Sequence, residues 1–464
     1  MKPLIPTLLA FAVLAGCKPP ATPTVAPAPD TQISAAPTPT PVVAVPPAID
    51  PTVSVLELAP APSERAGYQR PKIIDFHAHL SLDGQERIQR VMRDNGIEIM
   101  VNLSGGSMRR GPEQWVESKI LADTLGGHVL NFMNPDWSGF GGPEWGKREA
   151  ERLAEAVTRY EFRGLKIAKI LGLGAVDEGT GQLVKVDDPR LNPLWQKCAE
   201  LGVPVTIHVA DPRAFWWPLN PDNERWDELK VHPGWAYGPI PPELAAELPP
   251  RPKPPSWGEL LQAAERMYRA NPQTIFIAVH FGNAAEDIDY VDGLLARNDN
   301  VYIDLAARVG EFGRHPADKL QAFFTKWQDR IVFGTDIGIG SDFLMLGSNG
   351  AVEPRLADVR PFYEAHFRFL ETAKKQIDHP SPIQGNWKVD AIDLPAPVLQ
   401  KLYHDNGKLL LDRAHLKELA GRIVVGREPL RFRPAARQVR DQGRGVHVRS
   451  APDRITEMRT ARPA

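Results

Sequence analysis

Two histidines separated by one residue, in the stretch DFHAH at residues 75–79, are the clearest sign of chemistry in this sequence. They end an apolar run starting at Ile73 that is typical of a short buried strand. Because side chains alternate along a strand, His77 and His79 point to the same side, and Asp75 shares that side. Two neutral imidazoles at a strand end can hold one metal ion such as zinc. A lone His-x-His is weak evidence, so the rest of the chain has to decide.

Three later apolar runs also end in residues that can bind a metal. The run at 205–208 ends in His208, the run at 277–280 ends in His280, and the run at 332–336 ends in Asp336. Each of these residues alone would be read as a core histidine or a helix-capping aspartate. Their shared position at the ends of apolar runs favours a metal site instead.

Apolar runs and amphipathic stretches alternate from about residue 71 onward. We predict eight strands, at 72–77, 97–103, 128–133, 163–169, 203–208, 275–280, 301–305 and 331–335. We predict helices between them, at 85–95, 112–125, 149–160, 259–270 and from the Asp188-Pro189 start signal to Leu201. This α/β pattern predicts a (β/α)8 TIM barrel, whose active site lies at the carboxyl ends of the strands. A doubly wound sheet is the alternative, but it would not bring strands 1, 5, 6 and 8 around one site so simply.

A long segment of about residues 210–258 follows the fifth predicted strand. It contains five of the eleven tryptophans of the chain, namely Trp216, Trp217, Trp226, Trp235 and Trp257. Loops of this length are usually functional or disordered, and the aromatic content argues for packing. We therefore predict a Trp-rich insertion, which either caps the barrel mouth and contacts substrate through Trp216 and Trp217, or packs against the rim.

The motifs together resemble the amidohydrolase superfamily. More narrowly, they resemble the amidohydrolase-related family that includes aminocarboxymuconate-semialdehyde decarboxylase. The similarity runs from about Ile73 to Leu411, and it rests on the motifs IDFHAH at 74–79, TIH at 206–208, VHFGN at 279–283, FGTD at 333–336 and YHDNG at 403–407. These motifs are specific for the family, and none of them is specific for a substrate.

The resemblance implies a role for each residue. His77, His79 and His208 would hold one divalent ion, expected to be Zn²⁺, with Asp336 as a further ligand or as the base. His280 would lie slightly further out and orient a water or polarise a substrate oxygen. A divalent ion brings the pKa of its water to about 7, and a nearby carboxylate can then take the proton.

Four basic residues leave choices open. Lys166 and Lys169 lie on the fourth predicted strand, where other members of the superfamily carry a carboxylated lysine between two metals. The narrower family usually uses one metal, so a single ion is expected and two ions remain the alternative. An unmodified lysine could pair with a substrate anion. Arg213 and Arg308 are further candidates for binding such an anion.

The two ends of the chain differ from its middle. Residues 1–16 are predicted to be a signal peptide, and Leu14-Ala15-Gly16-Cys17 resembles a bacterial lipobox, which implies lipid on Cys17 and a membrane-anchored protein that faces the periplasm or cell exterior. The outer membrane is favoured in a Gram-negative host, because the residue after the cysteine is not Asp. We expect a Pro/Ala-rich linker over 17–65, the barrel over 66–420 and a basic, disordered tail over 421–464. Cys198, in a helical pattern, reads as a buried apolar residue.

The net charge of −2 gives no reason to expect nucleic acid as a partner. We predict a metal-dependent hydrolase that acts on a C–O or C–N bond of a small organic molecule, such as an ester, lactone or amide. The first alternative is a decarboxylase of an unsaturated or aromatic acid. The second is a lipoprotein that uses the barrel only for binding, and the complete set of metal-binding residues argues against it. An oligomer is compatible with the sequence.

Overall fold

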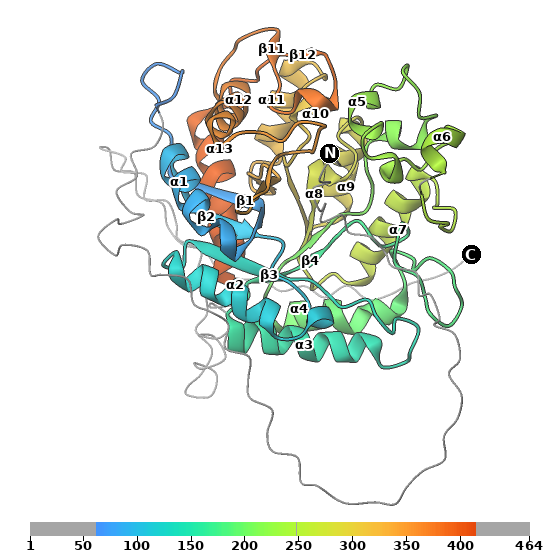
Figure 1. Cartoon of the computed structure of the whole chain (residues 1–464). Helices are drawn as coiled ribbons and strands as arrows, with labels where there is room; N and C mark the ends of the chain where they lie inside the picture. Colours follow the sequence, from blue (N-terminus) through green and yellow to red (C-terminus); the bar gives the residue numbers. More distant parts are fainter. Residues whose placement is uncertain (1–61, 247, 414–464) are drawn as a thin grey trace, which may run out of the picture. The chain divides into compact units, whose positions relative to one another are not determined.

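Eight parallel strands form the centre of the molecule in the computed structural model, which describes residues 62–246 and 248–413 (Figure 1). The strands are β1 (Ile73–Leu80), β2 (Ile97–Asn102), β3 (Val129–Met133), β4 (Gly164–Ile167), β5 (Val205–Ile207), β6 (Phe276–Ala278), β7 (Val301–Asp304) and β8 (Ile331–Val332). Each pairs in parallel with the next one along the chain. This order confirms the predicted (β/α)8 barrel and excludes the doubly wound sheet.

The helices lie outside the strands. The longer ones are α1 (Gln85–Asn95), α2 (Glu113–Thr124), α3 (Trp145–Tyr160), α4 (Asn192–Leu201), α7 (Trp257–Ala270), α9 (Ile288–Arg297), α11 (Ala317–Lys326) and α12 (Val359–Glu371). Shorter helices are α5 (Trp226–Leu229), α6 (Pro242–Ala245), α8 (Val279–Gly282), α10 (Val309–Phe312) and α13 (Ala396–Gln400). Single turns are η1 (Leu82–Gly84), η2 (Met108–Arg110), η3 (Pro189–Leu191), η4 (Arg213–Trp216), η5 (Pro233–Trp235), η6 (Leu356–Asp358), η7 (Pro382–Gln384) and the π-helical η8 (Lys401–Asp405).

The barrel closes where the chain leaves β8. Strand β9 (Ile337–Ile339) follows four residues later and pairs in parallel with the end of β1, and β10 (Leu344–Leu346) returns antiparallel to β9. Two backbone hydrogen bonds join the intervening residues to β1: Phe76 N–H donates to the carbonyl of Phe333 (2.8 Å), and Asp336 N–H donates to the carbonyl of His77 (2.8 Å). Strand 8, predicted over 331–335, is therefore regular only over its first two residues, because the chain then bends to reach β1.

A small apolar cluster fills the inside of the barrel, with Ile74, Phe76, Phe132 and Ile277 among its members. The helical segment at 406–413 contributes Leu410 and Leu411 to the same cluster. Asn406, in the predicted closing motif, donates its side-chain amide to the carbonyls of Gln328 and Ile331 (2.7 Å each) and so fixes the start of β8. A much larger apolar cluster lies between the strands and the surrounding helices.

The start signals of two helices act as the residue types predict. Asp188 accepts a hydrogen bond from the backbone of Arg190 at the start of η3, directly before α4. Ser256 and Glu259 form a reciprocal capping box at the start of α7. Helix α3 begins at Trp145, four residues before its predicted start, because Trp145 and Gly146 are already buried against the barrel.

The segment after β5 folds into a cap with its own small core. It contains η4, α5, η5 and α6, and the buried apolar residues of its core are Phe215, Leu219, Leu229 and Ala236. Trp216, Trp226 and Trp235 pack against this core, whereas Trp217 is 47 % exposed. The predicted Trp-rich insertion is therefore present as a packed unit. A two-stranded ribbon of β11 (Ile377–Asp378) and β12 (Lys388–Val389) lies in the segment between α12 and α13.

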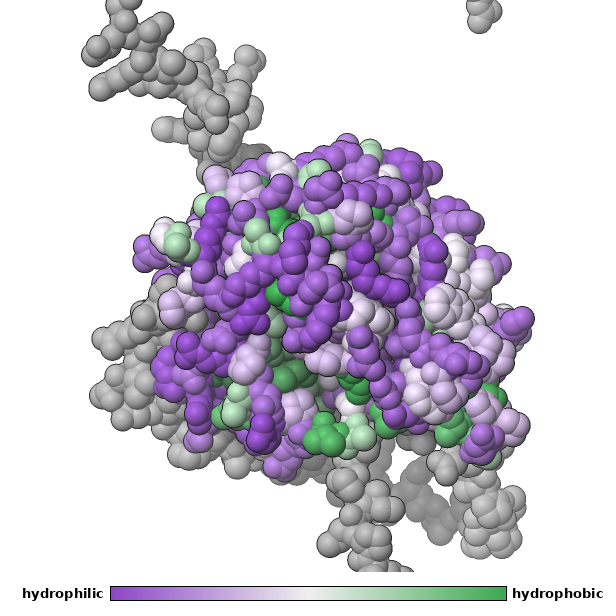
Figure 2. Space-filling model, turned by 90° about the horizontal axis from the view of Figure 1, so that it is seen from above, coloured by the Kyte–Doolittle hydropathy of each residue, from purple (hydrophilic) through white to green (hydrophobic). Residues whose placement is uncertain are grey.

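The face seen in Figure 2 is mostly hydrophilic, and its hydrophobic residues lie in small separate patches. None of the helices within 62–246 and 248–413 combines the length and apolar character needed to cross a bilayer. Cys198 is a free, buried thiol, and burial places its pKa above the ordinary range. The predicted signal peptide, the lipidation site Cys17, most of the linker and the basic tail lie outside the described residues.

Candidate metal centre

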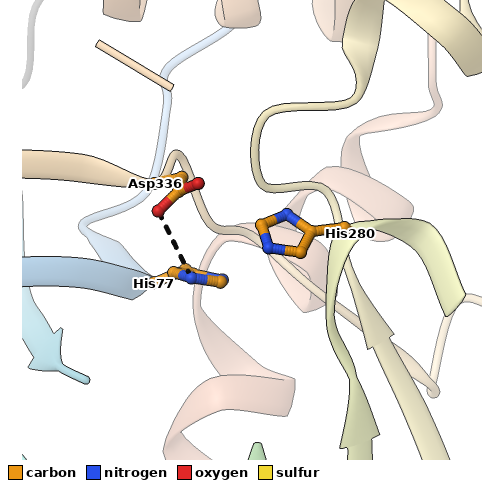
Figure 3. Close-up of side chains that lie close together, drawn as sticks. All are labelled: His77, His280 and Asp336. Carbon is orange, nitrogen blue, oxygen red and sulfur yellow. Dashed lines mark ion pairs between the residues drawn. The ribbon is translucent and has the colours of Figure 1, made fainter. Parts of the chain in front are cut away.

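Five side chains from four parts of the barrel meet at one end of the ring. His77 and His79 are on β1, Asp336 lies between β8 and β9, His208 directly follows β5 and His280 lies in α8 after β6. One ligand atom from each of His77, His280 and Asp336 lies within 4.8 Å of the other two (Figure 3). His208 was expected among the inner ligands and His280 slightly further out, whereas the tightest group contains His280. The roles of these residues stay predictions.

Unusual backbone conformations place two of these residues. His280, Phe281 and Asn283 all have φ of 57°, and Asp336 has φ of 64°, in the left-handed region that side chains other than glycine rarely adopt. Such strain persists where the surrounding structure imposes it, and it is concentrated at functional sites. Gly334 allows its backbone to lie close to His77, because a Cβ at this position would come within 2.9 Å of His77 Cβ.

Short distances connect the five groups. Asp336 Oδ1 lies 3.4 Å from His77 Nε2 and 3.2 Å from His79 Nε2. On the other side, His280 Nε2 lies 3.1 Å from His208 Nδ1. The Asp336–His77–His79 group lies next to the His208–His280 pair, since the ring centroids of His77 and His280 are 4.9 Å apart.

Hydrogen bonds behind the rings decide where the imidazole protons lie. His77 Nδ1 faces the carboxylate of Asp304 at 2.7 Å, and His280 Nδ1 faces the carbonyl of Ala306 at 2.8 Å. Both partners only accept, so these Nδ1 atoms carry the protons and the Nε2 atoms keep free lone pairs. His79 Nδ1 faces the hydroxyl of Ser104 at 2.7 Å, which fixes its ring but not its tautomer.

Burial keeps the inner imidazoles neutral. It lowers the pKa of His208 to about 4, and it lowers the pKa of His77 as well, with a further contribution from the positive charge of Lys166. The pKa of His280 lies well below the ordinary range because of burial and its neighbour His208. For Asp336, burial opposes ionisation, but the facing His77 and His79 and the charge of Lys166 outweigh it and hold the pKa below its ordinary range.

Two further carboxylates brace the strands that carry these groups. Besides His77, Asp304 at the end of β7 accepts a hydrogen bond from the backbone of His280 (2.7 Å). Asp75 on β1 accepts from the side chain of Thr335 (2.6 Å) and from the hydroxyl of Tyr363 (2.7 Å), and burial raises its pKa to about 6. Asp75 therefore ties the barrel seam together rather than facing a ligand.

The two predicted lysines differ in their surroundings. Lys166 is on β4 and only 3 % exposed, and burial lowers its pKa to about 8 although the charges of Asp336 and Asp304 oppose this. Lys169 lies beyond the end of β4, where its ammonium group forms an ion pair with Asp211 (2.9 Å) and lies over the ring of Trp235. The charge of Lys169 is thus already matched within the protein.

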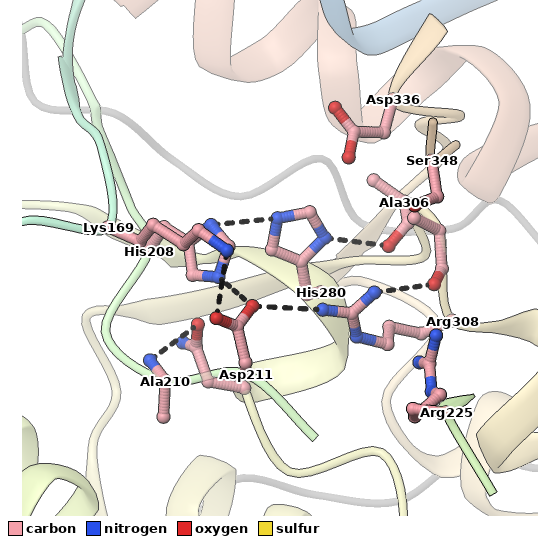
Figure 4. Close-up of polar contacts among 12 residues, drawn as sticks. Lys169, His208, Ala210, Asp211, Arg225, His280, Ala306, Arg308, Asp336 and Ser348 are labelled. Atoms are coloured by element: carbon pink, nitrogen blue, oxygen red, sulfur yellow. Dashed lines mark hydrogen bonds and ion pairs between the residues drawn. The ribbon is translucent and has the colours of Figure 1, made fainter. Parts of the chain in front are cut away.

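The predicted substrate-binding residues differ in how far they are buried and in what they contact. Arg308 is buried, with its guanidinium 3.7 Å from Asp211 and donating to the carbonyl of Ala307 (Figure 4). Arg213 pairs instead with Asp287 (2.8 Å) and lies over the ring of Trp257. Trp216 donates its indole N–H to the carbonyl of Pro255 and packs on Tyr237, and Trp217 is largely exposed. The contacts of Trp216 therefore match the rim-packing alternative.

The sequence of the barrel matches a known protein family. The model of a protein family described as amidohydrolase matches residues 74–412, most of the chain. The chain belongs to the amidohydrolase family. No curated protein matches its sequence significantly.

Solved structures show distant similarity to this amidohydrolase-family chain. An uncharacterised TIM-barrel protein from Bordetella bronchiseptica is 16 % identical, with 74 % of this chain and 100 % of that chain covered and a TM-score of 0.43. A 2,6-dihydroxybenzoate decarboxylase from Rhizobium is 14 % identical (73 % and 98 % covered, TM-score 0.41). A dihydroorotase from Campylobacter jejuni is 12 % identical (74 % and 84 % covered, TM-score 0.38). These likenesses are too distant to indicate a reaction.

The donor set fits a divalent ion. Free lone pairs on His77 Nε2 and His280 Nε2 face the same space as the ionised carboxylate of Asp336, without a proton donor among them. Three acceptor groups held this close repel one another unless a cation lies between them. Neutral imidazole and carboxylate are also the ligands that zinc and similar ions prefer. The residues of this amidohydrolase-family site are therefore suited to hold a metal.

Three residues of the site did not enter the predicted set. These residues are Asp304, Asp211 and Ser104. The signal for the first two is the one that identified Asp336, a carboxylate at the end of a predicted strand. Ser104 offers no such signal, because a serine after a strand is common in turns.

Proposed function

We propose that this protein is a metal-dependent hydrolase that cleaves a C–O or C–N bond of a small organic substrate. The observation that carries the proposal is the gathering of neutral imidazoles around the ionised carboxylate of Asp336. We propose one divalent ion, Zn²⁺, with His77, His79, His208 and Asp336 as the residues that hold it. Membership of the amidohydrolase family supports this assignment.

The chemistry divides between the ion and the side chains. A divalent ion in this site would act as a Lewis acid on a substrate oxygen and would make water more acidic. Asp336 takes the proton of the attacking water and delivers it to the leaving group, because its carboxylate stays ionised. His280 Nε2 accepts a hydrogen bond from the same water, since its Nδ1 proton is held by Ala306.

Substrate binding is proposed for the groups around this centre. The buried Arg308 and Lys166 supply positive charge, and Trp216, Trp217 and Arg213 belong to the cap and rim. These two buried cations are also the observation that favours the second candidate, decarboxylation of an unsaturated or aromatic acid. A carboxylate substrate would find both a cation and a metal in the same site.

Metal content tests the centre. Elemental analysis of the purified full-length chain should find about one divalent ion per chain, and the double variant His77→Ala/His79→Ala should lose it. His280→Ala should keep the ion, because His280 acts on water rather than as a ligand. A parent protein without metal after growth and refolding with Zn²⁺, Mn²⁺ or Fe²⁺ would refute the proposal, and two ions per chain would favour a lysine bridge.

Isotope incorporation separates the two reactions. Esters, lactones, amides and aromatic acids are screened with the metal restored, and the active substrate is turned over in heavy-oxygen water. Hydrolysis places one solvent oxygen in the product, as mass spectrometry detects. Release of carbon dioxide without label at the cleaved carbon would replace the hydrolase assignment by the decarboxylase and leave the metal centre unchanged.

A further inference from the structure

Asp211 joins the cap to the candidate metal centre. It lies four residues after β5 at the entrance to the cap, and its side chain is buried. Its Oδ2 forms the ion pair with Lys169 and accepts a hydrogen bond from the hydroxyl of Tyr237 at 3.1 Å. Its Oδ1 lies 3.3 Å from His208 Nε2 and 3.7 Å from a guanidinium nitrogen of Arg308. Figure 4 shows this carboxylate between the lysine, the imidazole and the arginine.

His208 depends on this carboxylate. Its Nε2 is buried and has no well-aligned hydrogen-bond partner in the described part of the chain, and Asp211 Oδ1 is the carboxylate oxygen that faces it, at 3.3 Å. The cations of Lys169 and Arg308 flank this carboxylate, which therefore offers an acceptor to a proton on Nε2. His280 Nε2, 3.1 Å from His208 Nδ1, competes with Asp211 for the single proton of this imidazole, and a proton held by Asp211 leaves Nδ1 free to bind an ion.

The cap fixes Asp211 from above. Tyr237 and Phe215 belong to the cap, and the backbone of Tyr237 donates to the carbonyl of Phe215. The indole of Trp257, just after the cap, donates to the backbone carbonyl of Asp211 (3.1 Å). The rings of Phe215 and Trp235 lie against the Lys169 ammonium group, which pairs with Asp211. The cap therefore packs on the ion pair rather than on the imidazole itself.

We propose that Asp211 is a positioning residue for His208, and that the cap holds Asp211 in place through Tyr237. This inference rests on the proposed metal centre, where His208 is a ligand. The cap then has a second role besides covering the site. Both the packing of the cap and the tautomer of His208 depend on the carboxylate of Asp211. Carboxylates behind metal-ligating histidines act in this way in other proteins, and their loss typically lowers metal affinity about 10- to 100-fold.

The test measures the tautomer of His208 and the metal affinity separately. Full-length protein with ¹⁵N-labelled histidine is compared, free of metal, as the parent and as Asp211→Asn, with His208→Gln used to assign the signal. The parent should show the proton on Nε2, and Asp211→Asn should lose that preference. With Zn²⁺ supplied from a chelator buffer, Asp211→Asn should bind about 10- to 100-fold more weakly. Tyr237→Phe should shift both measurements in the same direction by less.

Asp287→Asn is the matched control. It removes an ion pair between the base of the cap and α9, with Arg213, but has no contact with His208. It should leave both the tautomer and the affinity at the parental values. If Asp211→Asn behaves like this control, Asp211 serves only to dock the cap and the proposal is wrong. If the parent binds no metal, the proposed function fails, and the metal-free tautomer still decides whether Asp211 orients His208.

Discussion

At the residue scale, Asp336 is the general base of the proposed mechanism. Replacement by Asn keeps the size of the side chain and removes the oxygen that takes the proton. Loss of a general base typically lowers the rate on the order of 10²–10⁴-fold. We therefore expect Asp336→Asn to retain the fold and part of the metal but to lose most turnover. Steady-state kinetics on the identified substrate, with metal content and circular dichroism as controls, measure this. Near-parental turnover would remove Asp336 from the mechanism.

Burial of the Lys166 ammonium group costs the folded chain stability. Its pKa is lowered from the ordinary 10.5 to about 8, so the unfolded chain binds more protons than the folded chain between these values. Stability attributable to this group therefore rises from pH 8 to about 10, and the full destabilisation is present at pH 7. Lys166→Met should raise the free energy of unfolding at pH 7 by about 1–4 kcal/mol.

Urea denaturation at pH 7 and pH 10 tests this expectation. The stabilising effect of Lys166→Met should shrink at pH 10, where the parental lysine is neutral in the fold. The exposed Lys72, paired with Glu98, offers the control, and Lys72→Met should change the free energy of unfolding by less than about 1 kcal/mol at both pH values. A destabilised Lys166→Met variant would show that Lys166 supports the fold through its neighbouring aspartates.

At the scale of elements, a buried ion network anchors the cap. Arg225 in the cap is fully buried and pairs with Glu228 (2.6 Å) and with Glu311 in α10. The hydroxyl of Ser348, from the segment after β10, donates to Glu228. The cap is thus connected to two barrel loops far from it in sequence.

Arg225→Met should release the cap while the barrel stays folded. It leaves two buried carboxylates without their counter-charge, which typically costs about 3–5 kcal/mol. Limited proteolysis should then cut within residues 213–246 well before the barrel is digested. Arg213→Gln, which breaks the partly exposed pair with Asp287 and the contact with the Trp257 ring but leaves the buried network intact, should be cut at the parental rate. Equal protease resistance of Arg225→Met and the parent would contradict this role of the network.

Regular helices and strands could be predicted from the sequence, whereas the irregular segments where they end could not. Helix α1 coincides with its predicted range because an amphipathic stretch ends at Gly96, which adopts a left-handed conformation. Strand 8 was predicted too long because its apolar pattern continues to Phe333, whereas the pairing partner changes from β7 to β1 at that point. Only the tertiary contact with β1 explains the positive φ of Asp336.

The same distinction holds for the site. His77, His79, His208, His280 and Asp336 could be found because each ends an apolar run. The partner of His77 could not, since Asp304 lies 227 positions away and their contact depends on the register around the whole ring. The tautomers follow from such partners, so the acceptor character of the centre was visible only in the structure.

At the scale of the whole molecule, we propose that lipid on Cys17 anchors the protein to a bacterial membrane, with the barrel on the periplasmic or exterior side. The proposal rests on the lipobox-like sequence that ends in this cysteine. Cys17→Ser should block lipidation, so the protein should appear in the soluble fraction or remain unprocessed. Membrane fractionation with a blot for the precursor measures this, and a variant of mature length that still sediments with membranes would contradict it.

The seam of the barrel also sets when the metal centre can form during folding. Asp75 and Thr335, which meet across the seam, are 260 positions apart, and His77 and Asp336 flank the same contact. Contacts between residues so distant in sequence require the closure of a very long loop and form slowly. A nascent chain released only as far as β7 already carries four of the five residues of the centre but lacks Asp336 and the seam. On the proposed assignment, in which Asp336 is a ligand, the complete metal centre forms only after the ring has closed.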